Sequence, residues 1–477
     1  LKERAKFLRA KDRVERLKRL VLSGDGAPDL DRKMLAVLTR ADQPELFAML
    51  QRLFATLVVD GEADLAAQPK AWQEIAANDL APAFWALVRS QLGYTDAEPS
   101  LRDLLVRVLV TDLCRSLDGA PPRQLAHFVL PDRALAANAS VFAARWRSDL
   151  AFFSSYNMLA RPVAQELNLA QLLTSYTAEQ LTECMAFEEV ELRVVQDLKQ
   201  RIVAGAGANM DVVHGLIARR RDGHWANPLL ASASERTRAL AACYDALTAA
   251  ADFFSLKASH AAGFSFADAA TAFGQYREYL YRFDQLYRHF HTAADAVEPS
   301  GWAVLHELRT SIENVYSGWF VPQLGAAWAK VVEGDQGLLQ RWAIPDVTPQ
   351  QAFYEREVQP LYSGGAKRVF VVISDALRYE VAQELVQFTN GKNRFKASLD
   401  AMLGVLPSYT ALGMAALLPH RTLAYKESAN LDVLADGHLV ATLEQRNEHL
   451  RSVGGMAIKA EDLMALGKEK GRELVRD

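Results

Sequence analysis

Along residues 1–343 the apolar positions recur at spacings of three and four, which predicts a succession of helices with one apolar face each. Short polar breaks that contain glycine or proline, such as "SGDGAPD" and "DGHWANP", separate the predicted helices. The segment "FGQYREYLYRFDQLYRHF" places its aromatic residues on one stripe, which favours a core-facing surface over a platform for stacking bases. We therefore expect a long helical region over residues 1–343, with one or two subdomains.

The pattern changes near Ile344, where prolines and a Gly-Gly pair lead into a run of β-branched and aromatic residues. Residues 369–374 have the length and composition of a strand buried on both faces, and residues 376–388 return to helical spacing. Strand-like and helical segments then alternate through "FKASLDAMLGVL", "TALGMAALL", "LVATLEQRNEHLRS" and "GMAIKA". We therefore expect residues 344–477 to form a doubly wound α/β domain, and an incomplete one, as if the chain were cut from a longer protein.

Composition and charge narrow the class of protein. Half of the 477 residues are hydrophobic, so at least two packed domains are expected. The formal net charge of -4 provides no global positive field for nucleic acid or acidic membranes. Cys114, Cys184 and Cys243 are far apart, which predicts neither a disulfide framework nor a thiolate zinc site and fits a reducing cytoplasm. No stretch approaches the roughly 18 apolar residues of a membrane-spanning helix, so no membrane contact is expected.

Two local concentrations of basic residues are candidates for DNA contact. They are the opening segment "LKERAKFLRAKDRVERLKRLV" and the run of Arg219, Arg220 and Arg221. Acidic residues interrupt the first and Asp222 follows the second, which favours solvated helix faces. We therefore expect DNA binding only if one of these local patches provides it.

Asp375 follows the predicted strand directly, at the carboxyl end where open α/β sheets place their ligand sites. A carboxylate there can bind a divalent cation through oxygen, while the N-terminus of the next helix supplies backbone donors for an anion. Aspartate between a strand and a helix is also a favoured helix cap. The position alone therefore leaves two interpretations of Asp375 open, a metal ligand and an N-cap.

The segment "GVLPSYTALGMAALLP" is the second candidate, because Ser408, Tyr409 and Thr410 precede a short helix rich in small residues. A hydroxyl at a helix N-terminus and close to a divalent metal can lose its proton and attack phosphorus. Serine and threonine are ordinary helix caps as well. This segment alone therefore permits either a nucleophile or a cap.

The two segments together are more specific, because they place Asp375 and Thr410 35 residues apart (410 − 375 = 35) in the order strand, helix, strand, helix. In "VVISDALRYE" and "LPSYTALGMAALLP" the sequence resembles the PglZ family of the alkaline-phosphatase superfamily, and in particular the type A members of BREX phage-defence systems. The resemblance is strongest over residues 312–477. It implies that Asp375 is the first metal ligand and that Thr410 is the metal-bound nucleophile, with Ser408 as the alternative nucleophile.

Arg378 and Glu380 belong to the segment "DALRYE", which resembles a sequence motif of the family, and the resemblance implies a supporting role for both. On a helix Asp375 and Arg378 would lie one turn apart, so Arg378 is expected to steady the aspartate or a phosphate. An ordinary surface ion pair between helix neighbours is the alternative for Arg378.

The resemblance also implies a function: a metal-dependent phosphoesterase, either a phosphatase or a phosphodiesterase with nuclease activity, in a bacterial phage-defence system. Zinc is the expected metal, other BREX-type defence proteins are the expected partners, and the cytoplasm is the expected location. The superfamily completes its two-metal site with Asp and His ligands downstream of the nucleophile. His420, His438 and His449 stand in no such cluster, so we expect two metals only in a complete domain. The alternative function is a non-catalytic scaffold subunit that assembles other defence proteins through its helical region.

Overall fold

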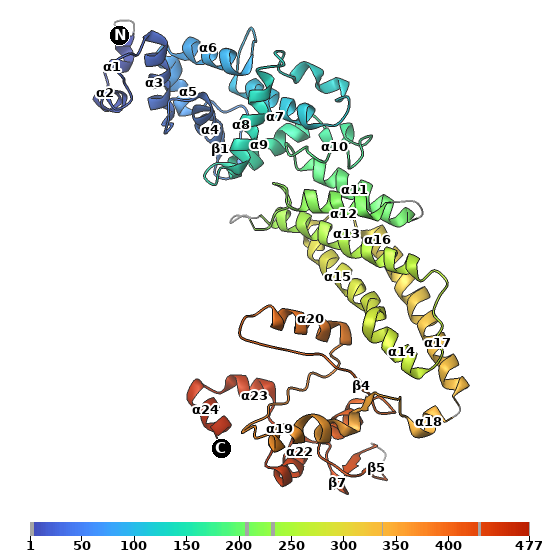
Figure 1. The fold of residues 1–477 in the computed structure, drawn as a ribbon. Helices are drawn as coiled ribbons and strands as arrows, with labels where there is room; N and C mark the ends of the chain where they lie inside the picture. Colours follow the sequence, from blue (N-terminus) through green and yellow to red (C-terminus); the bar gives the residue numbers. More distant parts are fainter. Residues whose placement is uncertain (1–3, 206–208, 230–233, 336, 428–430, 477) are drawn as a thin grey trace. The chain divides into compact units, whose positions relative to one another are not determined.

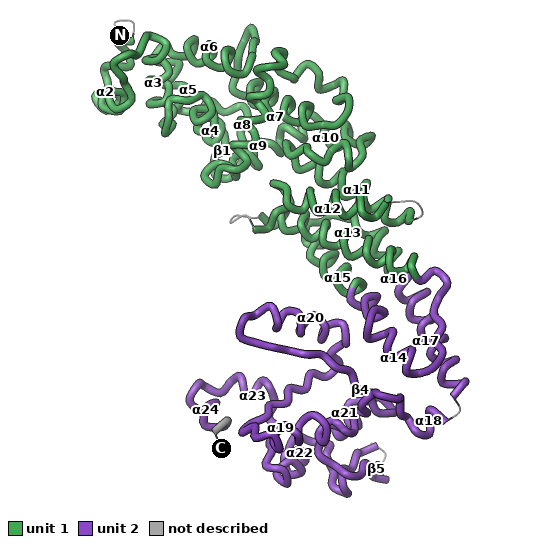
Figure 2. Tube along the Cα trace, in the orientation of Figure 1, with its two compact units in different colours: residues 1–259, 286–313 green, residues 260–285, 314–477 purple. Residues whose placement is uncertain are grey.

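The computed structural model describes residues 4–205, 209–229, 234–335, 337–427 and 431–476. The chain divides into two compact units, which we call unit 1 (residues 1–259 and 286–313) and unit 2 (residues 260–285 and 314–477), as Figure 2 shows. Unit 2 contains both Asp375 and Thr410. The domain boundary expected near Ile344 falls inside unit 2, and that boundary stays a prediction.

Unit 1 is built from helices whose apolar faces pack together, as the spacing of its apolar residues predicted (Figure 1). These helices are α1 (Ala5–Leu8), α2 (Lys11–Lys18), α3 (Ala27–Thr39), α4 (Leu46–Ala55), α5 (Lys70–Ala77), α6 (Ala81–Leu92), α7 (Leu101–Ser116), α8 (Ala136–Ser148), α9 (Phe153–Glu166), α10 (Leu169–Leu172), α11 (Glu189–Ala204), α12 (Met210–Arg221) and α13 (Glu235–Ser259). A short antiparallel ribbon of β1 (Val58–Val59) and β2 (Glu62–Ala63) follows α4. The helical region is therefore a packed structure of its own.

Helices α11, α12 and α13 share a buried polar cluster. Arg220 of α12 and Glu191 of α11 have no exposed surface, and Arg220 donates two hydrogen bonds to the Glu191 carboxylate. The other Arg220 hydrogen bonds go to the backbone carbonyls of residues 181, 182 and 184. Tyr244 of α13 donates its hydroxyl to Glu191 at 2.5 Å. One charge pair with its hydrogen bonds satisfied thus joins three helices inside an apolar core.

Each of the three consecutive arginines 219–221 forms an ion pair within unit 1. Successive helical residues point about 100° apart around the axis, so each arginine reaches a different neighbour. Arg219 pairs with Glu183 at 2.5 Å, Arg221 pairs with Asp245 at 2.8 Å, and Arg220 is buried as described. In the opening basic segment the ion pairs include Arg4 with Asp31, Lys6 with Asp79, Arg13 with Glu74, and Lys18 with Glu15. These pairs favour a structural role for both basic segments.

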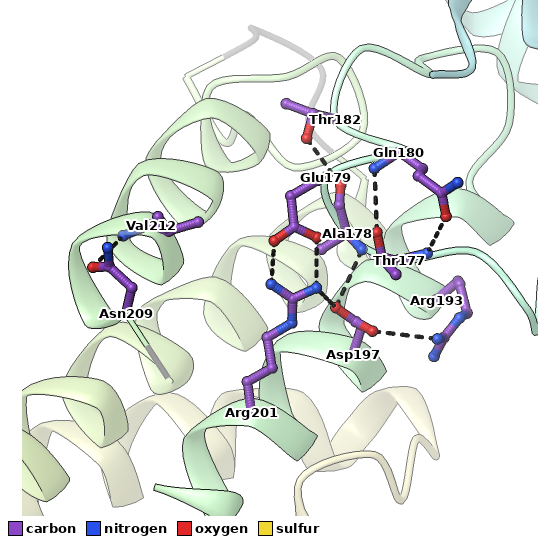
Figure 3. Close-up of polar contacts among 10 residues, drawn as sticks. All are labelled: Thr177, Ala178, Glu179, Gln180, Thr182, Arg193, Asp197, Arg201, Asn209 and Val212. Atoms are coloured by element: carbon purple, nitrogen blue, oxygen red, sulfur yellow. Dashed lines mark hydrogen bonds and ion pairs between the residues drawn. The ribbon is translucent and has the colours of Figure 1, made fainter. Parts of the chain in front are cut away.

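A second ion cluster holds the loop before α11 (Figure 3). Arg201 of α11 donates to both carboxylate oxygens of Glu179 and also lies 2.8 Å from Asp197. Asp197 accepts the backbone N–H of Ala178 at 3.2 Å and pairs with Arg193 at 3.4 Å. The hydrogen bond from Arg201 lowers the pKa of Glu179 to about 2. Glu179 is therefore ionised at neutral pH.

Within the described residues, α13 is the one helix with the length and hydropathy of a membrane span. It packs against α11 and α12, and 61% of its apolar window is buried inside the protein. A buried core helix has the same composition as a membrane span, so α13 is explained by its place in the core.

Two long helices, each of which continues along the chain from one unit into the other, are interrupted by π-helical turns. Helix α14 (Ala269–Gln275) passes through the turn η3 (Tyr276–Leu280) into α15 (Tyr281–Val297), and α16 (His306–Val315) passes through η5 (Tyr316–Phe320) into α17 (Val321–Gly334). Helices α14 and α17 lie side by side, and α18 (Leu338–Arg341) follows (Figure 1). The Phe283 and Phe320 rings stack with their centroids 4.4 Å apart. This contact packs the two interrupted helices together.

The remainder of unit 2 mixes short helices with short strands. Its elements are β3 (Thr348–Pro349), the π turn η7 (Tyr354–Val358), α19 (Gln359–Ser363), α20 (Tyr379–Asn390), β4 (Met402–Leu403), α21 (Thr410–Ala416), β5 (Leu423–Tyr425), β6 (Val433–Ala435), β7 (His438–Leu439), α22 (Leu443–Leu450), α23 (Ala460–Ala465) and α24 (Lys468–Arg476). Strands β3 and β4 pair in parallel, whereas β5, β6 and β7 form an antiparallel meander. Helix α21 packs its buried Leu412, Ala415 and Ala416 against the meander residues Val433 and Ala435.

The strand expected at residues 369–374 is an extended segment without a strand partner among the described residues. Val369 is half-buried and residues 370–374 are exposed, with Phe370 at 70% and Val372 at 88%. A strand buried on both faces needs neighbours that satisfy its backbone groups, and the described residues place none beside it. A strand was also expected at residues 455–460, but residues 455–459 are irregular and Ala460 begins α23. The doubly wound parallel sheet is thus not formed here, and parallel pairing is confined to β3 and β4 among the described strands.

Helix α20 begins three residues later than the apolar spacing predicted. Ala376 has a φ of +59°, in the left-handed region that disfavours residues with a Cβ. Arg378 is in the extended region, so the first helical residue is Tyr379. Nothing in the local sequence indicates a turn at an alanine, which explains why the helix start was placed too early.

Candidate functional site

Asp375 lies in the turn that joins the extended segment to α20. The turn is closed by a hydrogen bond from the Leu377 N–H to the Ser374 carbonyl at 3.4 Å, with Ala376 in the left-handed conformation between them. The N-cap of α20 is Arg378, and no side chain caps this helix. Asp375 is therefore not a helix cap, and its exposed carboxylate is available to a ligand.

Thr410 is the first residue of α21. The extended Tyr409 is the N-cap, and no side chain makes a capping hydrogen bond, so neither Thr410 nor Ser408 is a cap. Ser408 is exposed in the loop before the helix. The small residues of α21 allow it to pack closely on the meander, with Ala415 and Ala416 fully buried. That packing holds the Thr410 end of the helix at the surface.

The structure brings Asp375 and Thr410 together. The Thr410 hydroxyl donates a hydrogen bond to Asp375 Oδ2 at 3.3 Å. This distance is longer than the usual 2.5–3.0 Å of an O–H···O bond, so the contact itself is weak. Two oxygen ligands of one tetrahedral zinc ion, each about 2.0–2.2 Å from the metal, are about 3.3–3.6 Å apart. The two oxygens therefore have a separation that suits neighbouring ligands of one divalent cation.

Further metal ligands are not assembled around this pair. Within the described residues there is no group of three or more His, Cys, Asp or Glu side chains that could hold a metal ion. His420 Nδ1 lies 2.7 Å from the Leu418 carbonyl, and His449 Nε2 contacts the Pro419 carbonyl. His438 belongs to β7. His420 and His449 thus contact backbone carbonyls, whereas the His438 side chain is exposed.

Arg378 does not contact Asp375 in the way that helical spacing predicted, because these residues precede the helix. Its guanidinium lies 3.1 Å from Asp284 Oδ1 and donates to the Tyr316 hydroxyl at 2.9 Å. Burial opposes the charge of Arg378, but the contacts with Tyr316, Asp284 and Glu380 raise its pKa overall. Arg378 is therefore an anchor between the Asp375 turn and the helices of unit 2.

Glu380, the other residue of the "DALRYE" segment, is fully buried in the first turn of α20. Asp284 is 7% exposed and was not a candidate in the sequence. Tyr276 was assigned to an aromatic stripe facing the core, yet its hydroxyl donates to Asp284 Oδ2 at 2.8 Å. The one signal in the sequence was an aspartate inside that aromatic stripe, where a buried carboxylate needs partners.

Comparison with known proteins assigns the C-terminal part of the chain to the alkaline phosphatase-like class. Residues 353–477 match the family described as the BREX system PglZ alkaline phosphatase-like domain. Residues 353–477 are therefore similar to a PglZ domain, and the resemblance seen in the two motifs is confirmed.

Two curated relatives extend this likeness over the helical region. "Alkaline phosphatase-like protein BrxZ" of Escherichia coli O9:H4 (strain HS) is 34% identical over 477 residues, which cover 100% of this chain and 54% of that protein. "Alkaline phosphatase-like protein PglZ" of Bacillus cereus (strain H3081.97) is 27% identical over 477 residues, covering 99% of this chain and 52% of that protein. The chain thus spans about half the length of these relatives. No solved structure matches it.

Proposed function

We propose that this chain carries the nucleophile and the first metal ligand of a metal-dependent phosphoesterase that acts in a cytoplasmic, BREX-type phage-defence system. The observation that supports the proposal is the contact of Thr410 with Asp375 at 3.3 Å, because it joins two side chains that are 35 residues apart and that serve no capping role. The match of residues 353–477 to a PglZ alkaline phosphatase-like domain supports the proposed reaction class.

In the proposed reaction Thr410 Oγ1 attacks the phosphorus of a phosphate ester. The hydroxyl proton leaves to solvent, the new Oγ1–P bond forms as the ester P–O bond breaks, and the alcohol departs. Water then attacks phosphorus and releases Thr410 and phosphate. Asp375 orients the hydroxyl by accepting its hydrogen bond, and both residues are exposed, so a substrate can reach them. Bound zinc supplies the positive charge that favours the ionised hydroxyl and the developing negative charge.

We propose this activity for the whole protein, because the curated relatives are about twice as long as the chain. In such a protein further Asp and His side chains would complete a two-metal site, to which the described residues contribute Asp375 and Thr410. Arg378 and Glu380 would support that site through their contacts in unit 2. The substrate class is a phosphate monoester or diester, and other defence proteins would bind the helical region.

Substitution of Thr410 tests the nucleophile. In the whole protein T410A should lower zinc-dependent hydrolysis of an aryl phosphate by at least about 10³-fold, since loss of a nucleophile removes the covalent route. S408A is the matched control, because Ser408 is a neighbouring exposed hydroxyl outside the contact with Asp375. Undiminished hydrolysis by T410A would contradict the assignment, and loss of activity in S408A alone would transfer the role to Ser408.

A non-catalytic scaffold is the second candidate. It is favoured by the absence, within the described residues, of a group of three side chains that could hold a metal. A native preparation without bound divalent metal, and without a rise of melting temperature on adding zinc, would support it. A DNA-directed nuclease would share the proposed site but needs an additional binding surface. Salt-dependent DNA binding would be its first evidence.

A further inference from the structure

The carboxylate of Asp284 is held by three donors from three different segments of unit 2. Tyr276 donates to Oδ2 at 2.8 Å, and Tyr316 donates to Oδ1 at 2.5 Å. Arg378 also donates to Oδ1, at 3.1 Å, and contacts the Tyr316 hydroxyl at 2.9 Å. We call Tyr276, Asp284, Tyr316 and Arg378 the Asp284 cluster. Arg378 is its only member from the segment that contains Asp375.

The two tyrosines occupy equivalent places in the helices. Tyr276 is the first residue of the π turn η3, and Tyr316 is the first residue of the π turn η5. In an uninterrupted α-helix of 3.6 residues per turn, residues eight apart lie about 80° from alignment. A π turn accommodates about one extra residue, which brings Tyr276 and Asp284 to within roughly 20° of the same face. The interruptions thus place these side chains where they meet, and π turns are frequent at functional sites.

Burial makes the Arg378 contact more than an ordinary ion pair. The Asp284 side chain is 10% exposed, and a buried carboxylate is costly without a cation and hydrogen bonds to compensate it. Burial and the hydrogen bond to Asp284 raise the pKa of Tyr316 to about 12, so its hydroxyl stays protonated and donates. Arg378 supplies the positive charge. Its position is therefore fixed by a carboxylate that cannot easily pair with anything else.

The segment around Asp375 has few other anchors. Residues 370–374 are exposed, and residues 369–374 pair with no strand among the described residues. Only Ala376 and Leu377 separate Asp375, the candidate metal ligand, from Arg378. Behind Arg378, the Tyr379 ring contacts the rings of Tyr276 and Tyr281, with centroids 6.2 and 5.6 Å away. The start of α20 is thus docked on η3 and on the first residue of α15, directly beside the Asp375 turn.

We propose that the Asp284 cluster is the positioning device of the Asp375 turn: it holds Arg378 against the helical part of unit 2 and thereby presents Asp375 to Thr410 and to the metal. Asp284, Tyr276, Tyr316 and Arg378 are positioning residues, because they do not touch the reacting atoms. The catalytic meaning of this device rests on the proposed phosphoesterase function. The docking of the turn does not, so the two can be tested separately.

Hydrogen–deuterium exchange on the 477-residue chain tests the docking. The amides of Val381 and Ala382 bond to the Arg378 carbonyl, both at 3.1 Å, and report on the start of α20. In D284N and R378Q their exchange should rise by at least about tenfold, the change expected for loss of one charge-assisted hydrogen bond. R341Q is the matched control, since Arg341 also pairs with an aspartate of unit 2 but lies outside the cluster.

Kinetics on the whole protein test the effect on the site. In zinc-dependent hydrolysis of an aryl phosphate, kcat of D284N and of the double variant Y276F/Y316F should fall by at least about tenfold, with KM within about twofold of its original value. The melting temperature should stay close to that of R341Q. A merely structural role would lower the melting temperature and leave kcat per folded molecule unchanged.

The outcomes separate the two proposals. If the unsubstituted protein shows no zinc-dependent hydrolysis, the phosphoesterase function fails, and exchange at Val381 and Ala382 still decides whether the cluster holds the turn. Unchanged exchange in both D284N and R378Q overturns the positioning proposal, whatever the kinetics show. Faster exchange throughout unit 2 also overturns it, because the cluster would then stabilise the unit as a whole.

Discussion

The Thr410 hydroxyl lies 3.3 Å from the carboxylate of Asp375, across 35 residues of chain. Each side chain stands beside the start of a short helix that it does not cap, so neither is needed there for local structure. Both are exposed, and their oxygens have the separation of neighbouring ligands on one divalent cation. The affinity of the protein for zinc is therefore the most direct measure of what this pair does.

Replacing Asp375 by asparagine keeps the size of the side chain and removes its charge. We expect D375N to lower the affinity for Zn²⁺ by at least about tenfold, because an anionic ligand is replaced by a neutral one. Calorimetric titration of the whole protein with zinc measures this change. D346N, at an exposed aspartate of unit 2, should bind zinc like the original protein. Equal affinities for D375N and D346N would contradict the assignment of Asp375 as a ligand.

The buried pair of Arg220 and Glu191 makes a prediction about stability. R220M leaves the Glu191 carboxylate buried without its cation, so the free energy of unfolding should fall by about 3–5 kcal/mol. Denaturation by urea, followed by circular dichroism, measures the loss.

R219M is the control for this experiment, because Arg219 forms an exposed pair with Glu183, and we expect a change of at most about 1 kcal/mol. The double variant R220M/E191L should recover part of the stability that R220M loses, since both charges are then removed. Equal effects of R220M and R219M would show that the buried ion pair contributes no more to the free energy of unfolding than the exposed one.

The sequence predicted the helices of unit 1 because their apolar spacing is a local property, and packing then follows it. The three arginines at 219–221 show the limit of local information. They are identical residues in one run, yet only Arg220 is buried, since its surroundings come from α11 and α13. Residues 369–374 show the same limit, because their composition suits a buried strand but the pairing of a strand depends on its neighbours.

At the candidate site the motifs identified Asp375 and Thr410, whereas the partner of Arg378 was missed. Asp284 lies 94 residues before Arg378, and no spacing rule connects the two. The left-handed Ala376 was equally hidden, since alanine gives no signal for that conformation. The contact of Arg378 with Asp284 and the left-handed conformation of Ala376 could therefore be found only from the three-dimensional structure.

Because Glu179 is paired with Arg201, the free energy of unfolding should depend on pH in the acidic range. The folded pKa of Glu179, about 2, lies below its ordinary value of 4.5, so its contribution is present above pH 4.5 and is lost as the pH falls toward 2. The Glu179 side chain is 43% exposed, and solvent screening limits the effect to about 1 kcal/mol or less at pH 7.

Comparison of E179Q with the original protein measures this contribution. Urea denaturation should show the full difference in unfolding free energy at pH 7 and a shrinking difference below pH 4.5. E62Q, at an exposed glutamate of β2, is the control and should follow the original protein at each pH. A difference that grows as the pH falls would contradict the assignment of the lowered pKa.

His224 also makes stability fall as the pH falls, but it does so at higher pH and because its ring is buried in the neutral form. Burial, and less strongly the positive charge of Arg147, lowers the pKa of His224 from 6.5 to about 3. Its Nε2 lies 2.6 Å from the side-chain oxygen of Asn157, which fits a neutral ring that donates its N–H. Between pH 6.5 and 3 the unfolded chain therefore takes up a proton that the folded protein does not, and stability decreases as the pH falls.

H224Q removes the titrating group while an amide N–H can still reach Asn157. We expect the original protein to lose about 3 kcal/mol more than H224Q in unfolding free energy between pH 6.5 and pH 4, at about 1.4 kcal/mol per pH unit. Urea denaturation at several pH values measures the two slopes. H127Q, at an exposed histidine of unit 1, should keep the slope of the original protein. A slope in H224Q as steep as in H127Q would place the acid sensitivity elsewhere in the chain.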